Sequence, residues 1–344
     1  MRRSVFPITF AASVLLAGCS RPIPLDRDLL IATANPGGTY YPVGVAMATL
    51  ISGELGPTAG ILASPITSTG SSENITMLQA DEVQLALLQG IFASMAWQGN
   101  GLYEGRRATT LRGLAMLWPN VEQVLVFQRF VKTGTVDDVG GLAGEIFSLG
   151  PRSSGTEVSG RTILTTLGIE PGRDFTVANL EYGPSADALQ NRRIAGYFLP
   201  GGIPTGVISQ SFATLGGDSV ALLEFTDEHL ARLRATHPVW NRFVIPANTY
   251  PGQEQPVRTL AQPNVLTTTS AADAEVIYLV MRTLWTRIGF LHKQHAATRI
   301  MTLERAFAGL PLPLHPGAIR FYQEAGLKVP AELYPPELPA PSAP

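Results

Sequence analysis

The sequence predicts an α/β protein built from two lobes that face each other across a ligand cleft. Apolar, strand-like runs alternate with helix-like stretches, which is typical of parallel α/β sheets. The order strand, Gly/Ser-rich loop, helix occurs near Asn35 and again near Pro151. A chain of 344 residues also has room for two lobes. One large α/β domain remains the alternative, because the pattern of elements does not separate the two.

The expected elements fill the chain between two short terminal segments. Short apolar runs bounded by turn residues predict strands at residues 29–34, 60–66, 83–89, 111–117, 121–128, 145–149, 175–180, 195–199 and 220–225. Apolar residues at helical spacing predict helices at residues 41–54, 73–79, 91–97, 156–167, 271–294, 298–308 and 317–325.

The composition limits the class of protein. Hydrophobic residues make up 45% and charged residues 15%, so the chain can bury a core and is not a disordered polymer. The formal net charge is −2 and there is no long Lys/Arg run, which argues against a nucleic-acid partner.

The first residues have the features of an export signal. Arg2 and Arg3 precede a mostly apolar stretch at 5–16 that is too short to span a membrane, and Leu-Ala-Gly-Cys follows at 16–19. This string resembles the bacterial lipobox, so residues 1–18 are predicted to be a lipoprotein signal peptide with lipid attached to Cys19. An ordinary signal peptide with a chance Cys is the alternative.

The cysteine count agrees with lipidation. Cys19 is the only Cys in the chain, which excludes an intramolecular disulfide and a Cys-based metal site. The order of the predicted elements also divides the chain. We expect a tether at residues 19–28, lobe I at 29–122 and 256–334, lobe II at 123–255, and a Pro-rich, unstructured tail at 335–344. The chain is expected to cross between the lobes near residues 119–124 and 252–260.

The loop at residues 35–42 is the first candidate for ligand contact. Two glycines, one of them Gly38, allow the backbone to approach a ligand closely. Thr39 is expected to cap the following helix, whose first amides favour a carboxylate or phosphate. Tyr40 adds a hydroxyl on a rigid apolar ring. A Gly-rich turn with tyrosines packed in the core is the alternative.

Two further loops have the same character. Ser71, or its neighbour Ser72, is expected to cap a helix after the Ser/Thr/Gly loop at 68–74. The loop at 150–157 opens another helix and contains Arg152, which is able to hold a carboxylate through two hydrogen bonds. A surface Arg beside a Pro turn is the alternative for Arg152.

Motifs of catalysis are not found. The sequence has no Gly-x-Ser-x-Gly, no phosphate loop ending in Gly-Lys-Ser/Thr and no His-Glu-x-x-His. His292 and His295 lack an acidic neighbour at metal-ligand spacing and are expected to lie on a solvated face. The sequence therefore predicts no catalytic residue, no metal and no cofactor.

Six short strings together resemble the TAXI branch of the substrate-binding proteins of TRAP (tripartite ATP-independent periplasmic) transporters. Each string is weak alone, but their order and spacing are specific. They are GGTYYPVG at 37–44, TGSSEN at 69–74, LALLQ at 85–89, SGTE at 154–157, TYPGQ at 249–253 and LHPGA at 314–318.

The resemblance implies a type II periplasmic-binding fold with a two-crossing hinge and a central cleft. It implies a periplasmic receptor, expected to be a monomer, for a small carboxylate such as glutamate or 2-oxoglutarate, which it delivers to the membrane subunits of the transporter. The outer membrane is the expected site of the lipid anchor. Carried onto this chain, the ligand contacts are Gly38, Thr39, Tyr40, Ser71, Asn74, Gln89, Ser154, Gly155 and Thr156.

The chain departs from the family pattern in the second-lobe loop. Ser153 stands where relatives usually have the first Gly of Gly-Ser-Gly-Thr, and Arg152 precedes it. These changes bear on the identity of the ligand. Two other roles remain open: a periplasmic sensor subunit that docks on a signalling protein, and an enzyme evolved from a binding-protein scaffold.

Overall fold

The computed structural model describes residues 27–338. The predicted signal peptide, Cys19 and most of the predicted tether lie outside the described residues. Within residues 27–338, none of the helices combines the length and the apolar character needed to span a bilayer.

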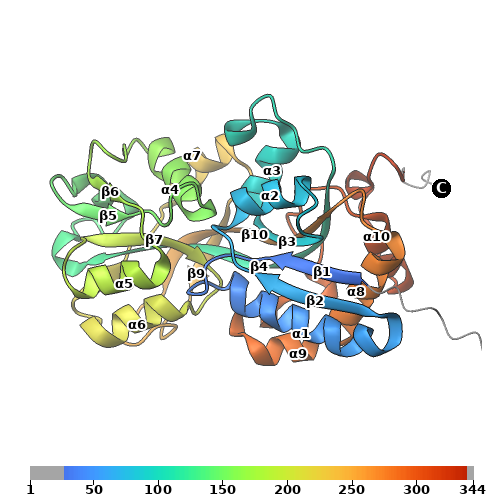
Figure 1. Cartoon of the computed structure of the whole chain (residues 1–344). Coiled ribbons are helices and arrows are strands. Elements are labelled where there is room, and N and C mark those ends of the chain that lie inside the picture. The colour runs from blue at the N-terminus through green and yellow to red at the C-terminus, as the bar shows by residue number, and fades with distance from the viewer. Residues whose placement is uncertain (1–26, 339–344) are drawn as a thin grey trace, which may run out of the picture.

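The described residues form a mixed sheet between two layers of helices (Figure 1). The strands are β1 (Arg27–Ala32), β2 (Ile61–Ile66), β3 (Leu85–Gln89), β4 (Leu111–Phe127), β5 (Ile146–Ser148), β6 (Thr176–Ala178), β7 (Gly196–Gly201), β8 (Val220–Leu222), β9 (Asn241–Ile245) and β10 (Val257–Thr269). The helices are α1 (Tyr40–Ala59), α2 (Ser71–Gln79), α3 (Gly90–Gln98), α4 (Gly155–Thr166), α5 (Tyr182–Gln190), α6 (Gly206–Leu215), α7 (Asp227–Thr236), α8 (Ala274–Thr286), α9 (Ile288–Gln294) and α10 (Pro316–Glu324).

The two ends of the sheet belong to different lobes. In lobe I, β2, β1 and β3 pair in parallel, and in lobe II, β6, β5 and β7 do the same. Buried apolar residues of α1, α8 and α10 pack together on one face of lobe I, with α2 and α3 on the other face. In lobe II, α4 and α7 lie on one side of the strands and α5 and α6 on the other (Figure 1).

Two long antiparallel strands, β4 and β10, connect the lobes. β4 pairs with β10 from Leu111 to Val121 and with β7 from Val121 onwards. β10 pairs with β9 up to Ala261 and with β3 from Asn264. Where the partners change, Pro119 lies opposite Pro263. Proline has no N–H to give to a strand ladder, so this pair marks a place where the ladder is interrupted in both strands.

The predicted boundaries between the lobes remain a prediction. The boundary at 122/123 falls inside β4, and the boundary at 255/256 falls just before β10.

Several predicted elements were wrong. The strands expected at 111–117 and 121–128 form one continuous strand, β4, and the purely parallel sheets expected from the alternation are interrupted by antiparallel β4 and β10. The helix expected at 271–294 is two helices that meet at Arg287. The helix expected at 298–308 consists of short 3₁₀ turns, in which the Thr298 hydroxyl donates to the carbonyl of Leu291. Strands β9 and β10 were not predicted from the sequence.

The first residues of the predicted tail lie against the body of the protein. Glu337 accepts two hydrogen bonds from the guanidinium of Arg112, at 2.7 and 2.6 Å. Arg112 is only 4% exposed. The prediction of an unstructured segment is therefore wrong for residues 335–338, and residues 339–344 lie outside the described part.

Candidate ligand site

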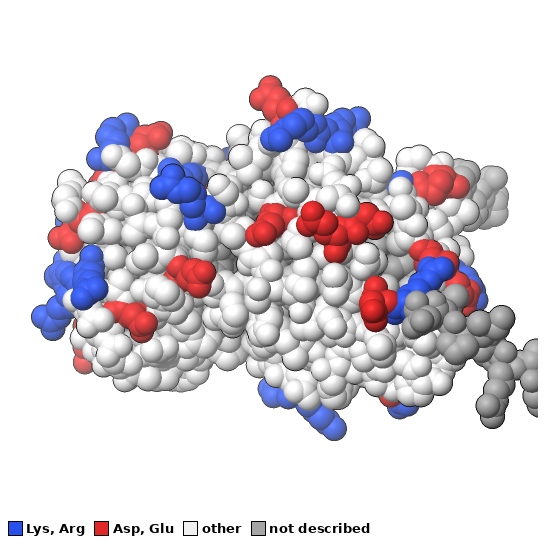
Figure 2. All heavy atoms as spheres, viewed as in Figure 1, with Lys and Arg blue, Asp and Glu red and all other residues white. Residues whose placement is uncertain are grey.

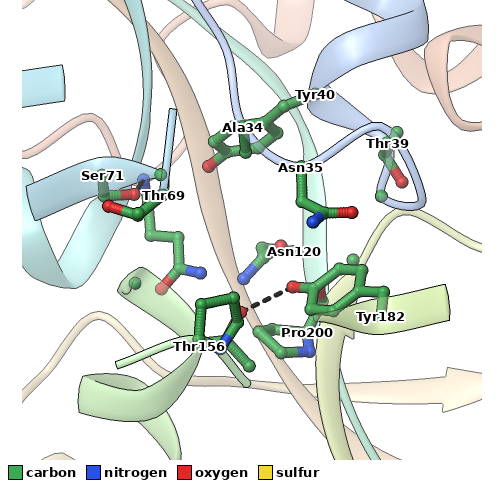
Figure 3. A pocket seen from close by; sticks show the side chains of 16 residues that line it. Ala34, Asn35, Thr39, Tyr40, Thr69, Ser71, Asn120, Thr156, Tyr182 and Pro200 are labelled. Carbon is green, nitrogen blue, oxygen red and sulfur yellow. Dashed lines mark hydrogen bonds between the residues drawn. The ribbon is translucent and has the colours of Figure 1, made fainter. Parts of the chain in front are cut away.

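A small cavity lies between the lobes, beside the place where the paired strands β4 and β10 pass from one lobe to the other. Its volume is about 40 Å³, enough for only a few water molecules. The residues that line it come from both lobes and from β4: Ala34, Asn35, Gly38, Thr39, Tyr40, Thr69, Gly70, Ser71, Gln89, Asn120, Pro151, Gly155, Thr156, Tyr182, Pro200 and Gly201. Figure 3 shows Asn120 between Tyr40 on one side and the Thr156–Tyr182 pair on the other.

The loop before α1 forms part of the lobe I wall and touches lobe II. A Cβ atom on Gly38 would lie 3.0 Å from the ring of Tyr182, so glycine allows this ring to approach the loop. The Thr39 hydroxyl accepts a hydrogen bond from the Gly202 amide at 3.0 Å. The prediction that Thr39 caps α1 was wrong, because its backbone is already helical and its side chain is used across the cleft.

The start of α2 and the end of β3 form another part of this wall. Ser71 accepts a hydrogen bond from the backbone amide of Gln89 at 2.9 Å. Ser71 and Ser72 are the first residues of α2, and the N-cap position belongs to Gly70, so the prediction of a Ser cap there was wrong. Gly70 has a φ of 107°, which glycine adopts without strain.

Lobe II contributes the start of α4 and the side chain of Tyr182. The Thr156 hydroxyl and the Tyr182 hydroxyl are 2.6 Å apart and hydrogen-bonded. Tyr182 also donates to the carbonyl of Pro200 at 3.2 Å. A Cβ atom on Gly155 would lie 3.2 Å from the Ser71 hydroxyl, so the absence of a side chain lets α4 approach lobe I.

Three of the predicted ligand residues do not line the cavity. Asn74 is buried and donates to the carbonyls of Thr33 and Leu87, at 2.7 and 2.8 Å, which ties α2 to the residue after β1 and to β3. Ser154 caps α4 by accepting from the Glu157 amide. Arg152 is exposed. The other seven predicted residues lie in the lining, and contact of all ten with a ligand remains a prediction.

Strands β4 and β10, which connect the lobes, supply polar residues that the sequence analysis missed. Asn120 lies opposite Gln262, and Asn264 lies opposite Gln89. The Tyr40 hydroxyl donates to the side-chain oxygen of Asn264 at 2.5 Å. The available signal was the presence of Asn120, Glu122 and Gln123 within an otherwise apolar run that reads as buried strand.

Four buried polar atoms in this region have no hydrogen-bond partner among the described residues. They are Oε1 of Gln89, Nδ2 of Asn120, Oε2 of Glu122 and Nδ2 of Asn264. Buried polar atoms in native proteins are nearly always hydrogen-bonded, because an unpaired one loses its contact with water without replacement. Their concentration at one place indicates that ligand or solvent atoms complete the site.

The lining carries no charged side chain. Glu122 lies nearby on β4 and is fully buried; burial raises the pKa of its carboxyl to about 8, against the opposing effect of hydrogen bonds from Gln262 and Ser159. Burial also raises the pKa of the Tyr40 and Tyr182 hydroxyls above 10, and a charge on Glu122 adds to both shifts. Neutral hydroxyls, amides and helix starts are therefore the polar groups that the cavity wall offers.

Comparison with solved structures identifies the fold. The chain is similar to MatC from Rhodopseudomonas palustris with bound malate, with a TM-score of 0.53, 12% identity, and coverage of 88% of this chain and 98% of that chain. It is similar to a protein from Bordetella bronchiseptica RB50, with a TM-score of 0.51, 12% identity, and coverage of 87% and 83%. It is also similar to XAC2383 from Xanthomonas citri bound to ATP, with a TM-score of 0.50, 12% identity, and coverage of 86% and 94%.

These similarities agree with an arrangement of two lobes that β4 and β10 connect. The predicted type II periplasmic-binding fold is confirmed. A family model described as the NMT1-like family matches residues 31–326, which is most of the chain. The chain therefore belongs to the NMT1-like family.

Proposed function

We propose that this protein is an extracytoplasmic receptor that binds a small carboxylate in the cavity between its lobes and delivers it to the membrane subunits of a TRAP transporter. The observation that carries the proposal is the group of buried, unpartnered polar atoms around the cavity. Two of the residues, Gln89 and Asn120, line the cavity itself. The oxygens of a bound carboxylate would accept a hydrogen bond from Nδ2 of Asn120, and a ligand hydroxyl or a water molecule would donate one to Oε1 of Gln89.

The chemistry of the lining favours a small anion. Two helices, α2 and α4, begin with cavity residues, Ser71 and Gly155. The first amides of a helix have no partner within the helix and lie at its partly positive end. Because α2 belongs to lobe I and α4 to lobe II, these amides offer donors to a carboxylate from both lobes. The bound malate of MatC, which shares the fold, is an example of such a ligand.

The same lining favours binding over catalysis. Within the described residues, the cavity wall has no Asp, Glu, His, Lys or Cys side chain that would act as a nucleophile or general base. The surface agrees with a small-molecule partner, because Lys and Arg form separate small groups on the face in Figure 2 and no continuous basic patch.

Entry of the ligand requires the lobes to separate. A cavity of about 40 Å³ is too small for a dicarboxylate. Contacts such as Thr39 with Gly202 join the lobes across it. The lobes are therefore closer together here than they would be around a dicarboxylate, and a ligand that touches both lobes would shift the population from open arrangements towards one that is closed around it.

Assignment to the TAXI branch, delivery to TRAP subunits, the periplasmic location and the lipid on Cys19 rest on the sequence. The six family strings and the lipobox-like Leu-Ala-Gly-Cys support them.

Calorimetric titration with L-malate, 2-oxoglutarate and L-glutamate tests the proposal. We expect at least one to bind and to raise the melting temperature, since a ligand at a hundred times its Kd stabilises the folded state by about 2.7 kcal/mol. The variant Gln89→Ala should weaken binding about tenfold, as expected for loss of one hydrogen bond to a charged group. Gln98→Ala, at an exposed position on α3, is the matched control. Absence of binding by all three compounds would contradict the proposal.

A further inference from the structure

A buried carboxyl group lies beside the cavity, where β4 passes from one lobe to the other. The side chain of Glu122 has no exposed surface. Its Oε1 accepts hydrogen bonds from Gln262 Nε2 at 2.9 Å and from Ser159 Oγ at 3.4 Å, and its Oε2 has no partner among the described residues. The group is therefore held in place from β10 and from α4, with one oxygen left unused.

Glu122 is coupled to both lobes through these bonds. Gln262 uses its other side-chain atom, Oε1, to accept from the amide of Ile91 at the start of α3 in lobe I. Ser159 belongs to α4 in lobe II. Glu122 itself lies opposite Pro200, which lines the cavity. The position is one where a change of charge acts on a ligand held between the lobes.

Among residues 27–338, no positively charged group contributes to the pKa of Glu122. The titratable groups that respond to Glu122 are the hydroxyls of Tyr40 on α1 and Tyr182 on α5, and a carboxylate there makes both harder to ionise. Charged groups on the elements packed around Glu122 have partners of their own: on α4, Glu157 pairs with Arg161, and on β10, Arg258 pairs with Asp227. Strand β7 contributes Tyr197, whose hydroxyl is bonded to Ser211, and α3 has no titratable residue.

We propose that Glu122 makes anion binding depend on pH, because its carboxyl group must carry a proton when an anion occupies the cavity, and the bound anion in turn retains that proton. The inference rests on the proposed function as an anion receptor. It adds that the site accepts its ligand as an anion together with a neutral, protonated Glu122. Proton and ligand then strengthen each other's binding by the same factor.

The pKa of about 8 places this titration within an accessible range. Below about pH 7 the carboxyl is protonated and affinity should not change with pH. As pH rises through the pKa, the ligand meets a carboxylate in a poorly solvated site. Repulsion between the unit charge of the carboxylate and that of the ligand, at an effective dielectric constant of about 20, should lower the affinity by about tenfold to a hundredfold.

The experiment is calorimetric titration of the wild-type chain with L-malate and 2-oxoglutarate between about pH 6.5 and about pH 9.5, where neither compound changes its own charge. The variant Glu122→Gln keeps an oxygen for Gln262 and Ser159 and stays neutral at every pH, so it should bind with a Kd that is independent of pH. Glu54→Gln, at an exposed position on α1, is the control and should follow the wild-type curve.

A second measurement does not depend on the variant's affinity. Infrared spectra of the wild-type protein at pH 7 should contain the carbonyl band of a protonated carboxylic acid, which disappears above about pH 8 and is absent from Glu122→Gln. Binding that is independent of pH in the wild type, or the lack of this band, overturns the inference and leaves the receptor function intact. Failure of every carboxylate to bind at any pH overturns both.

Discussion

Replacing Glu122 by Gln should stabilise the folded protein, and by an amount that depends on pH. Burial raises the pKa of this carboxyl from its ordinary 4.5 to about 8. The unfolded chain releases the proton near pH 4.5, whereas the folded chain keeps it up to about pH 8. Between these values the folded state binds more protons, so the free energy of unfolding falls as pH rises, and it levels off above about pH 8.

The magnitude follows from the size of this change. One pKa unit corresponds to about 1.4 kcal/mol, so the rise of the Glu122 pKa from 4.5 to about 8 lowers the free energy of unfolding by up to about 5 kcal/mol across this pH range. Gln at position 122 does not titrate and keeps the contacts to Gln262 and Ser159. The free energy of unfolding of Glu122→Gln, measured relative to the wild type, should therefore increase by up to about 5 kcal/mol between pH 4.5 and pH 8.

Urea denaturation of both proteins at a series of pH values is the assay. Other titrating groups are common to the two chains and cancel in the difference. A difference that stays constant across the range would refute the reasoning, because it would mean that Glu122 ionises in the folded protein as it does in the unfolded chain.

Two further predictions concern contacts that the structure adds to the sequence. Thr39→Val removes the hydrogen bond to Gly202 across the cleft and should favour the open state, which raises the ligand-free radius of gyration in X-ray scattering. Thr49→Val, at an exposed position on α1, should leave this radius unchanged. Equal radii for Thr39→Val and the wild type would show that this bond does not hold the lobes together. Glu337→Gln removes the carboxylate that pairs with the buried guanidinium of Arg112 and should lower the free energy of unfolding by about 1–3 kcal/mol; unchanged thermal unfolding would mean that the C-terminal contact contributes nothing.

Much of the fold was predictable because local pattern determines it. The loops after β1 and β5, and the helices that follow them, were predicted from the order of apolar runs and Gly/Ser-rich segments. β10 was missed for a physical reason: Gln262, Pro263 and Asn264 interrupt its apolar run, and Pro normally argues against a central strand. Here Pro263 lies opposite Pro119, at a position where both strands tolerate the loss of an N–H.

The candidate site was predictable only in part. Residues on the loops and at the helix starts, such as Gly38 and Thr156, carry a local signal, because small and hydroxylic residues gather where a helix begins. Glu122 and Gln262 are 140 residues apart, and only the pairing of β4 with β10 brings them together. Thr39 and Gly202 are 163 residues apart and meet across the cleft. No spacing within one segment predicts such contacts.

A crystal structure of the protein with the carboxylate that binds best in calorimetry tests the central claim most directly. The account predicts that the carboxylate lies between the lobes, with an oxygen about 3 Å from Nδ2 of Asn120 and further contacts at the start of α4. A carboxylate bound elsewhere on the protein, with the amide of Asn120 hydrogen-bonded only to water, would contradict it.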